Sequence, residues 1–254
     1  MKGEVRIDSV SRSHVGAVRN NNEDSFCDRE AEGFWAVADG MGGHERGEWA
    51  SGVIAEALGR VTLPGDFDLG CRLVPEAIHD ANARIWDEAS GRGIQMGSTV
   101  VALLIAQGRF AVFWVGDSRA YLLRDGMLIQ LTRDHTQVQE LVDRGLLSEE
   151  SAVDHPMSHV LARAVGVQPQ IEVDVVADEV EPGDLFLLCS DGLTGQVTDR
   201  EILSVLRRHG HDEAVEKLIA LTLERGAPDN VTVILAGVAE KTLLTLAQPA
   251  GTLS

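Results

Sequence analysis

The 254-residue sequence predicts an α+β fold in which antiparallel β-sheets are covered by helices. Two observations lead to this prediction. Short apolar runs with the period of β-strands follow one another along the chain, and turn residues separate several of them. Segments with helical spacing stand before and after these runs rather than between each pair, which argues against a repeated strand–helix–strand unit. We expect one domain over residues 1–240 and a flexible tail at 241–254.

The first half of the chain contains two expected helices between strands. Residues 34–38, with the sequence FWAVA, predict a buried strand that leads Asp39 into a cluster of glycines. Apolar residues at helical spacing predict helices at 47–60 and 69–89. The next predicted elements are strands at 98–106, 109–115 and 119–124, with hairpin turns at 107–108, 116–118 and 125–126.

The second half contains fewer strands, and most of its helices come late. The spacing of apolar residues predicts a helix near 137–144, within a mixed segment that runs to about Gly166. The elements expected after this segment are strands at 171–176 and 185–189, helices near 199–208 and 212–225, and a last strand at 231–235.

The composition limits the classes of function. Lys and Arg number 22 against 40 for Asp and Glu, and the formal net charge is −18. This acidity argues against a surface for nucleic acid backbones, which requires clustered basic side chains. The N-terminal residues lack the apolar core of a signal peptide, and no apolar run is long enough to cross a membrane. We therefore expect a cytoplasmic protein with neither nucleic-acid nor membrane partners.

Aspartates recur at the ends of the apolar runs. Asp39, Asp117 and Asp191 each follow one run, and Asp229 precedes the last. A single Asp-Gly is most simply a turn, and each of these residues alone could be one. In an antiparallel sheet, however, the C-terminal end of one strand lies beside the N-terminal end of its neighbour. Asp39, Asp191 and Asp229 could therefore meet at one rim.

A cluster of carboxylates points to a bound cation. Neighbouring carboxylates raise one another's pKa unless a cation lies among them, and all-oxygen sites suit Mg²⁺ or Mn²⁺ more than Zn²⁺. Two such ions about 4 Å apart can bind a phosphate, activate a water and stabilise a leaving oxygen. The segment VRNNNED adds Glu23 and Asp24 and contains Arg19, whose planar guanidinium is suited to phosphate oxygens. Considered alone, Arg19 would be a surface arginine.

Eight short motifs that occur in a fixed order identify a protein family more specifically than any one of them does alone. They are VRNNNED, AVADGMGG, MGSTVVALL, VGDSRAYLLRDG, LTRDHT, LARAVG, LLCSDGL and DNVTVIL. From about Asp8 to Gly237, the chain resembles the metal-dependent serine/threonine protein phosphatases of type 2C, in their bacterial form. The resemblance implies a four-layer α-β-β-α sandwich, two antiparallel sheets flanked by helices. It also implies hydrolysis of phosphoserine and phosphothreonine with two Mn²⁺ or Mg²⁺ ions.

The resemblance gives each matched residue a role. The metal ligands that it implies are Glu23, Asp39, the Gly40 carbonyl, Asp117, Asp191 and Asp229. Asp39 bridges the two tightly bound ions; Glu23 and Gly40 complete one site, and Asp191 and Asp229 complete the other. A third, weaker ion is held by Asp117 with Asp191. Arg19 binds the substrate phosphate, Asp24 and Asn230 support the site, and residues 135–166 form a mobile flap beside it.

One residue departs from the pattern of animal members, in which a histidine often assigned as general acid follows the Asp-Gly. This chain has Met41 there, and methionine cannot donate a proton. His44 is close in sequence, although a solvated turn histidine is the simpler interpretation. A water on the metal is the alternative donor.

The catalytic interpretation has two competitors. A phosphatase fold that binds partners without turnover would be marked by a lost metal ligand, and all matched positions are intact. A metal-dependent phosphodiesterase acting on nucleic acid is disfavoured by the acidic composition. No Ser or Cys stands in a nucleophile motif, which favours direct attack by water. We expect a monomer that acts on phosphorylated proteins and opposes a bacterial Ser/Thr kinase, and its compact form resembles phosphatases that regulate protein secretion.

Overall fold

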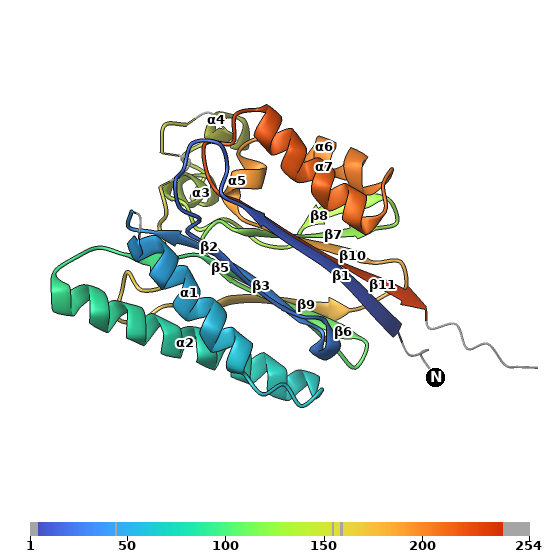
Figure 1. Cartoon of the computed structure of the whole chain (residues 1–254), viewed down its shortest axis with the longest axis horizontal. Coiled ribbons are helices and arrows are strands. Elements are labelled where there is room, and N and C mark those ends of the chain that lie inside the picture. The colour runs from blue at the N-terminus through green and yellow to red at the C-terminus, as the bar shows by residue number, and fades with distance from the viewer. Residues whose placement is uncertain (1–4, 44, 154, 158–159, 241–254) are drawn as a thin grey trace, which may run out of the picture.

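Two antiparallel sheets lie face to face, and helices cover the outer face of each (Figure 1). The computed structural model describes residues 5–43, 45–153, 155–157 and 160–240. This four-layer α-β-β-α arrangement confirms the expected fold class. His44 and the predicted tail at 241–254 lie outside the described residues.

The first sheet has five strands in the order β1-β11-β10-β7-β8, and all neighbours are antiparallel. Its strands are β1 (Val5–His14), β7 (Arg119–Arg124), β8 (Met127–Gln130), β10 (Leu185–Cys189) and β11 (Val231–Glu240). The chain's last described strand, β11, lies inside this sheet between β1 and β10 and pairs with β1 over ten residues. Segments from both halves of the sequence therefore form one layer.

The second sheet has the order β2-β3-β5-β6-β9 and is antiparallel throughout, with the short β4 paired to β3. Its strands are β2 (Asp24–Arg29), β3 (Phe34–Met41), β4 (Gly97–Ser98), β5 (Val100–Ala106), β6 (Arg109–Val115) and β9 (Asp174–Glu179). Between β2 and β3 the chain turns through the 3-10 helix η1 (Glu30–Glu32).

The helices belong to two outer layers and a projecting segment. They are α1 (Glu45–Arg60), α2 (Phe67–Arg92), α3 (Gln137–Asp143), α4 (Glu149–Val153), α5 (Asp191–Thr194), α6 (Asp199–Leu206) and α7 (His211–Glu224). Helices α1 and α2 cover the second sheet, whereas α6 and α7 lie over the first (Figure 1). The side chain of Asp66 caps the start of α2 by accepting from the Leu69 amide, and Gly93 ends it in the left-handed conformation.

The main core between the sheets is built from the inward apolar residues of both. Trp35 and Phe110 of the second sheet and Leu122, Phe186 and Ile234 of the first are among its buried members. The rings of Phe110 and Phe186 meet edge to face across the interface, with centroids 4.9 Å apart. Each such buried side chain contributes about 1.5–3 kcal/mol to the free energy of unfolding. The two packed sheets therefore form a rigid support for the strand ends.

The hairpin predicted at 116–118 is wrong. β6 pairs with β5 and β9, whereas β7 pairs with β10 and β8, so residues 116–118 carry the chain from one sheet to the other. Gly116 makes this crossing with a φ of 109°, and a Cβ there would lie 2.6 Å from Cγ2 of Thr99. The sequence showed two strands and a tight connection, but alternation of apolar residues does not reveal which strands pair. Asp117 consequently lies between the sheets.

Several other boundaries differ from the prediction. The strand expected at 171–176 is found at 174–179, and the last strand continues to Glu240. The strands β1 and β8 and the helix α4 were not predicted. For β1 the reason is its polar sequence, VRIDSVSRSH, which lacks a long apolar run. The hairpin at Asp125-Gly126 is confirmed. Within the described residues, none of the helices combines the length and apolarity required to span a bilayer.

Candidate metal and phosphate site

One cavity of about 960 Å³ brings the sequence-predicted residues together. Its lining includes Arg19, Glu23, Asp39, Gly40, Asp117, Asp191 and Asp229, whereas Asp24 and Asn230 are buried beside it. The expectation that the aspartates meet is therefore confirmed. The rim is not that of a single sheet, however, because Asp39 lies near the end of β3 in the second sheet while the other two flank β10 and β11 in the first.

The end of β3 is held by backbone and hydroxyl contacts rather than by a free turn. The Asp39 amide donates to Oγ1 of Thr99 at 3.1 Å, and the Thr99 amide donates to the Asp39 carbonyl at 2.8 Å. Thr99 Oγ1 also lies 2.6 Å from Oγ of Ser118, beside Asp117. These bonds fix the positions of Asp39 and Asp117 relative to each other.

Glu23 and Gly40 converge at the start of α1. The Gly40 amide donates to the Glu23 carbonyl at 3.1 Å. A Cβ added to Gly47 would lie 2.6 Å from Oε2 of Glu23 and 2.8 Å from the carbonyl oxygen of Gly40. A carboxylate oxygen and a carbonyl oxygen therefore share the space beside Gly47, which only a residue without a side chain leaves open.

Asp24 is a buried carboxyl behind the cavity. Its Oδ2 accepts from Oγ of Ser190 at 2.8 Å and from Oγ1 of Thr232 at 2.7 Å. Its Oδ1 has no hydrogen-bond partner among the described residues. Burial, partly offset by the two hydroxyls, raises the pKa of Asp24 to about 7, and the charges of Asp191 and Asp229 add to the rise. Asp24, the first residue of β2, thus links the second sheet to β11 and to the residue after β10 in the first sheet.

Two of the carboxyls that face the cavity have a raised pKa. Desolvation, followed by the charges of Asp24 and Asp191, raises the pKa of Asp39 well above its ordinary value. Desolvation and Asp191 raise the pKa of Asp117 to about 8. The main physical cause is burial, to which the crowding of like charges adds, and a cation placed among the carboxyls would oppose both effects.

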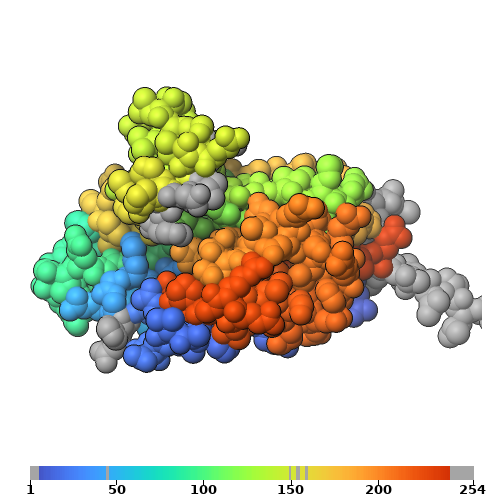
Figure 2. Space-filling view, turned by 90° about the horizontal axis from the view of Figure 1, so that it is seen from above, coloured from blue at the N-terminus to red at the C-terminus, as the bar shows by residue number. Residues whose placement is uncertain are grey.

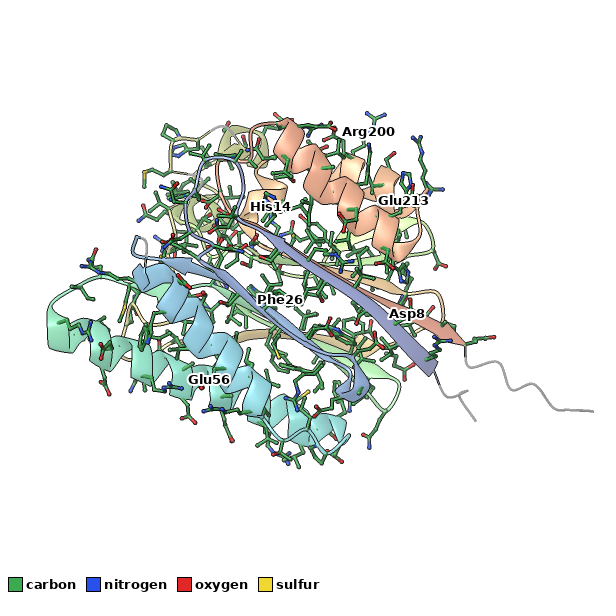
Figure 3. All side chains as sticks on the ribbon, viewed as in Figure 1. Asp8, His14, Phe26, Glu56, Arg200 and Glu213 are labelled. Carbon is green, nitrogen blue, oxygen red and sulfur yellow. The ribbon has the colours of Figure 1, made fainter. Side chains whose placement is uncertain are left out.

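Arg19 supplies the cationic group of the site. It is exposed, and its Nη2 donates to Oδ2 of Asp229 at 2.8 Å, the bond that contributes most to raising its pKa. Its loop begins after His14 at the end of β1 (Figure 3) and is held by Asn230. Asn230 donates to the carbonyls of Val15 and Asn21 and accepts from the Glu23 amide at 2.7 Å. The supporting role expected of Asn230 is thus a specific set of bonds.

The donor set fits hard divalent cations. The proposed ligands at the cavity, Glu23, Asp39, Gly40, Asp117, Asp191 and Asp229, all offer oxygen, as Mg²⁺ and Mn²⁺ prefer. In the described part of the chain, no three His, Cys, Asp or Glu side chains are arranged to hold an ion by themselves. Asp229 accepts a hydrogen bond from Arg19, and Asp24 accepts hydrogen bonds from the hydroxyls of Ser190 and Thr232. The carbonyl of Gly40 beside Glu23 is therefore an essential part of the fit.

Three supporting hydroxyl residues escaped the sequence analysis. Thr99, Ser190 and Thr232 are buried and bond Asp39 or Asp24. Only Ser190 adjoins a proposed ligand, Asp191, whereas Thr99 and Thr232 bond aspartates far away in the sequence, and small hydroxyl residues near strand ends are too common to be a signal.

The flap segment stands apart from the sheets. Its helices α3 and α4 project from the body of the molecule (Figure 2, yellow-green). Its first residues are anchored by Arg119, which binds Asp134 through both carboxylate oxygens at 2.7–3.1 Å. His135 lies behind the crossing between the sheets, where its Nδ1 accepts from the Gly116 amide at 3.1 Å.

Comparison with known proteins agrees with this geometry. The model of the family described as "Protein phosphatase 2C" matches residues 4–141. The chain belongs to this family of protein serine/threonine phosphatases. It is 40% identical over 238 residues to "Serine/threonine protein phosphatase PstP" of Mycobacterium tuberculosis (strain ATCC 25618 / H37Rv), a match that covers 91% of this chain but only 45% of the relative.

Two solved structures of family members are similar over almost their whole length. "PppA, a key regulatory component of T6SS in Pseudomonas aeruginosa" has a TM-score of 0.85 and 39% identity, with coverage of 92% of this chain and 100% of that one. The catalytic domain of PstP, solved in complex with two manganese ions, has a TM-score of 0.83 and 38% identity, with coverage of 93% and 100%.

Proposed function

We propose that the chain is a metal-dependent protein serine/threonine phosphatase. The observation that carries this proposal is the convergence, in one cavity, of the Arg19 guanidinium and the carboxylates from two facing sheets. Membership of the phosphatase 2C family and the two manganese ions in the PstP catalytic domain support it.

The proposed ligands divide between two ions. Asp39 would contribute to both sites, Glu23 and the Gly40 carbonyl would hold one ion, and Asp191 with Asp229 would hold the other. A third, weaker ion is assigned to Asp117 with Asp191. When bound, Mn²⁺ or Mg²⁺ ions would hold phosphate oxygens and make water nucleophilic at neutral pH.

The chain's own residues bind and orient the substrate. Arg19 grips the phosphate oxygens, and its pairing with Asp229 keeps the guanidinium at the cavity before substrate arrives. Asn230 holds the loop that carries Arg19 and Glu23, and Asp24 keeps the sheets in register beside the site. Met41 lines the cavity but has no proton to give, so the proton for the leaving serine or threonine oxygen would come from His44, which lies outside the described residues, or from a water at the metal site.

A binding module without turnover is the competing proposal. It would require the loss of a ligand, and all proposed ligand positions carry an oxygen donor at the cavity. The net charge of −18 opposes nucleic acid as the substrate.

The partners follow from the same proposal. Phosphorylated proteins are the substrates, and the chain acts as a cytoplasmic monomer that opposes a Ser/Thr kinase. Its similarity to PppA supports a role in the control of a secretion system.

The test is hydrolysis of p-nitrophenyl phosphate and a phosphothreonine peptide by the purified chain, before and after chelation. We expect turnover that EDTA abolishes and Mn²⁺ or Mg²⁺ restores. Undiminished turnover after rigorous chelation and dialysis would refute the metal mechanism. Metal binding without turnover of either substrate would favour the binding module.

A further inference from the structure

The cavity is much larger than a phosphate group requires. Its volume of about 960 Å³ is in the range that proteins use for whole organic ligands. The carboxylates and Arg19 line only one part. The remaining walls come from the C-terminal end of α2 with the residues after it, and from residues 160–168.

This second part of the cavity is mainly apolar, although Ser90, Gln95, Arg163 and Gln168 also line it. We call it the annex and define it by Met41, Trp86, Ile94, Val160 and Val167, which all line the cavity. Val160 is 40% exposed and Val167 is 46% exposed, so two aliphatic side chains at its wall remain in contact with water. Apolar surface left in water beside a polar site is typical of a binding surface.

The annex begins directly beside the proposed metal site. Met41 follows Gly40, whose carbonyl is a proposed ligand. A Cβ added to Gly97 would lie 2.9 Å from both Cε of Met41 and Cγ2 of Val167. The two side chains therefore meet over Gly97 and form one apolar surface that continues from the site.

One wall of the annex is held rigidly by α2. Asn82 is 2% exposed, and its Oδ1 accepts from the Gly166 amide at 2.7 Å while its Nδ2 donates to the Gln168 carbonyl at 3.0 Å. Val165 exchanges two backbone hydrogen bonds with Ser98 at 2.9 and 3.0 Å. The backbone on both sides of Val167 is thus fixed, and a site that is already formed loses little entropy on binding.

Gly166 shows how closely this wall approaches the helix. Its φ is 86°, and a Cβ there would lie 2.1 Å from Cγ2 of Ile85. Because the backbone at Gly166 already touches Ile85 of α2, this wall cannot move closer to the helix and close the annex.

We propose that the annex binds an apolar side chain of the phosphoprotein substrate, located within three residues of the phosphorylated serine or threonine. The proposal rests on the phosphatase function proposed above. An extended peptide advances ~3.3 Å per residue, so a side chain near the phosphoresidue reaches a surface that borders the metal site. An acidic side chain would instead face a cavity lined by several carboxylates, whose two arginines, Arg19 and Arg163, are already paired with Asp229 and Asp174.

The experiment uses phosphothreonine peptides in which each of the three positions on either side is occupied in turn by Leu or Ser. We expect kcat/KM to be about 10-fold higher for Leu at one or two positions, because pockets for aliphatic groups discriminate by roughly 10–200-fold. In Val167→Ser and Val160→Ser, the Leu-to-Ser ratio should fall toward 1. Val175→Ser, at a 56% exposed position of β9 outside the cavity, should keep the ratio of the unmodified chain.

Two results would overturn the proposal. One is the absence of a Leu preference at all six positions, and the other is a preference that survives in both annex variants. The absence of turnover on every phosphopeptide would instead refute the phosphatase function, so the two failures are distinguishable.

Discussion

Adding one methyl group at Gly47 should damage the metal site without changing its charge. Gly47 and Gly52 both lie in α1, and neither has a positive φ. At Gly47 the new Cβ would lie 2.6 Å from Oε2 of Glu23 and 2.8 Å from the Gly40 carbonyl, whereas at Gly52 nothing lies within 4 Å. The pair Gly47→Ala and Gly52→Ala therefore separates the effect of the site from that of the helix.

The magnitudes follow from the contacts. Replacing Gly by Ala inside a helix raises the free energy of unfolding by about 1 kcal/mol. A methyl group forced into an already filled space lowers it by about 1–3 kcal/mol. Gly52→Ala should raise Tm by about 2–4 °C, whereas Gly47→Ala should leave the free energy of unfolding unchanged or lower it by up to about 2 kcal/mol. Glu23 must move by about 0.4–0.8 Å to restore a contact of 3.0–3.4 Å. A misplacement of this order costs up to about 100-fold in rate.

The assay is kcat/KM for p-nitrophenyl phosphate over a Mn²⁺ titration, with thermal unfolding of each variant. We expect Gly47→Ala to lose about 10- to 100-fold at low Mn²⁺ and to recover part of this at high Mn²⁺, because the displaced ligand weakens metal binding. Gly52→Ala should have unchanged activity. The reasoning is refuted if Gly47→Ala matches Gly52→Ala in both activity and Mn²⁺ dependence.

Three further substitutions test separate parts of the site. Arg19→Ala should mainly raise KM for phosphopeptides, since phosphate is gripped in ground and transition states alike; a fall in kcat alone would assign Arg19 to the transition state. Asp117→Ala should keep two tightly bound Mn²⁺ ions but lose most activity on phosphopeptides, and full activity at ordinary Mn²⁺ would make Asp117 a turn residue. Burial lowers the pKa of His135 below 6.5, so the unfolded chain binds more protons and stability falls as pH drops through 6.5. Between pH 7.5 and pH 5.5, the Tm of His135→Gln should fall by less than the Tm of the unmodified chain. An equal fall in both would contradict this linkage.

The sequence predicted the parts of the site that depend on local pattern. Asp39 and Asp191 each stand at the end of a strongly apolar run, and Arg19 stands four residues before Glu23, so their convergence could be expected from antiparallel pairing and the order of motifs. The hairpin at 116–118 failed because two consecutive strands with the same alternation can belong to one sheet or to two. Pairing depends on tertiary contacts that alternation does not encode.

Other features depend on atoms brought together only by folding. Gly47 is one glycine among 26 in the sequence, and its importance follows from the oxygens of Glu23 and Gly40 that crowd it. Asn82 lies in the middle of a helix and holds a wall 84 residues away in sequence. The apolar annex joins β3, α2 and the end of the flap, and no single segment reveals it.

The central claim is that Asp39 is the ligand shared by two ions. Its most direct test is the number of Mn²⁺ ions bound per chain at equilibrium, measured by dialysis for the unmodified chain, for Asp39→Asn and for Asp178→Asn at an exposed position of β9. We expect two tightly bound ions in the unmodified chain and in Asp178→Asn. In Asp39→Asn both ions should be weakened together, by at least about 10- to 100-fold, while the fold persists. Retention of two tightly bound ions in Asp39→Asn, or the loss of only one, would contradict the account.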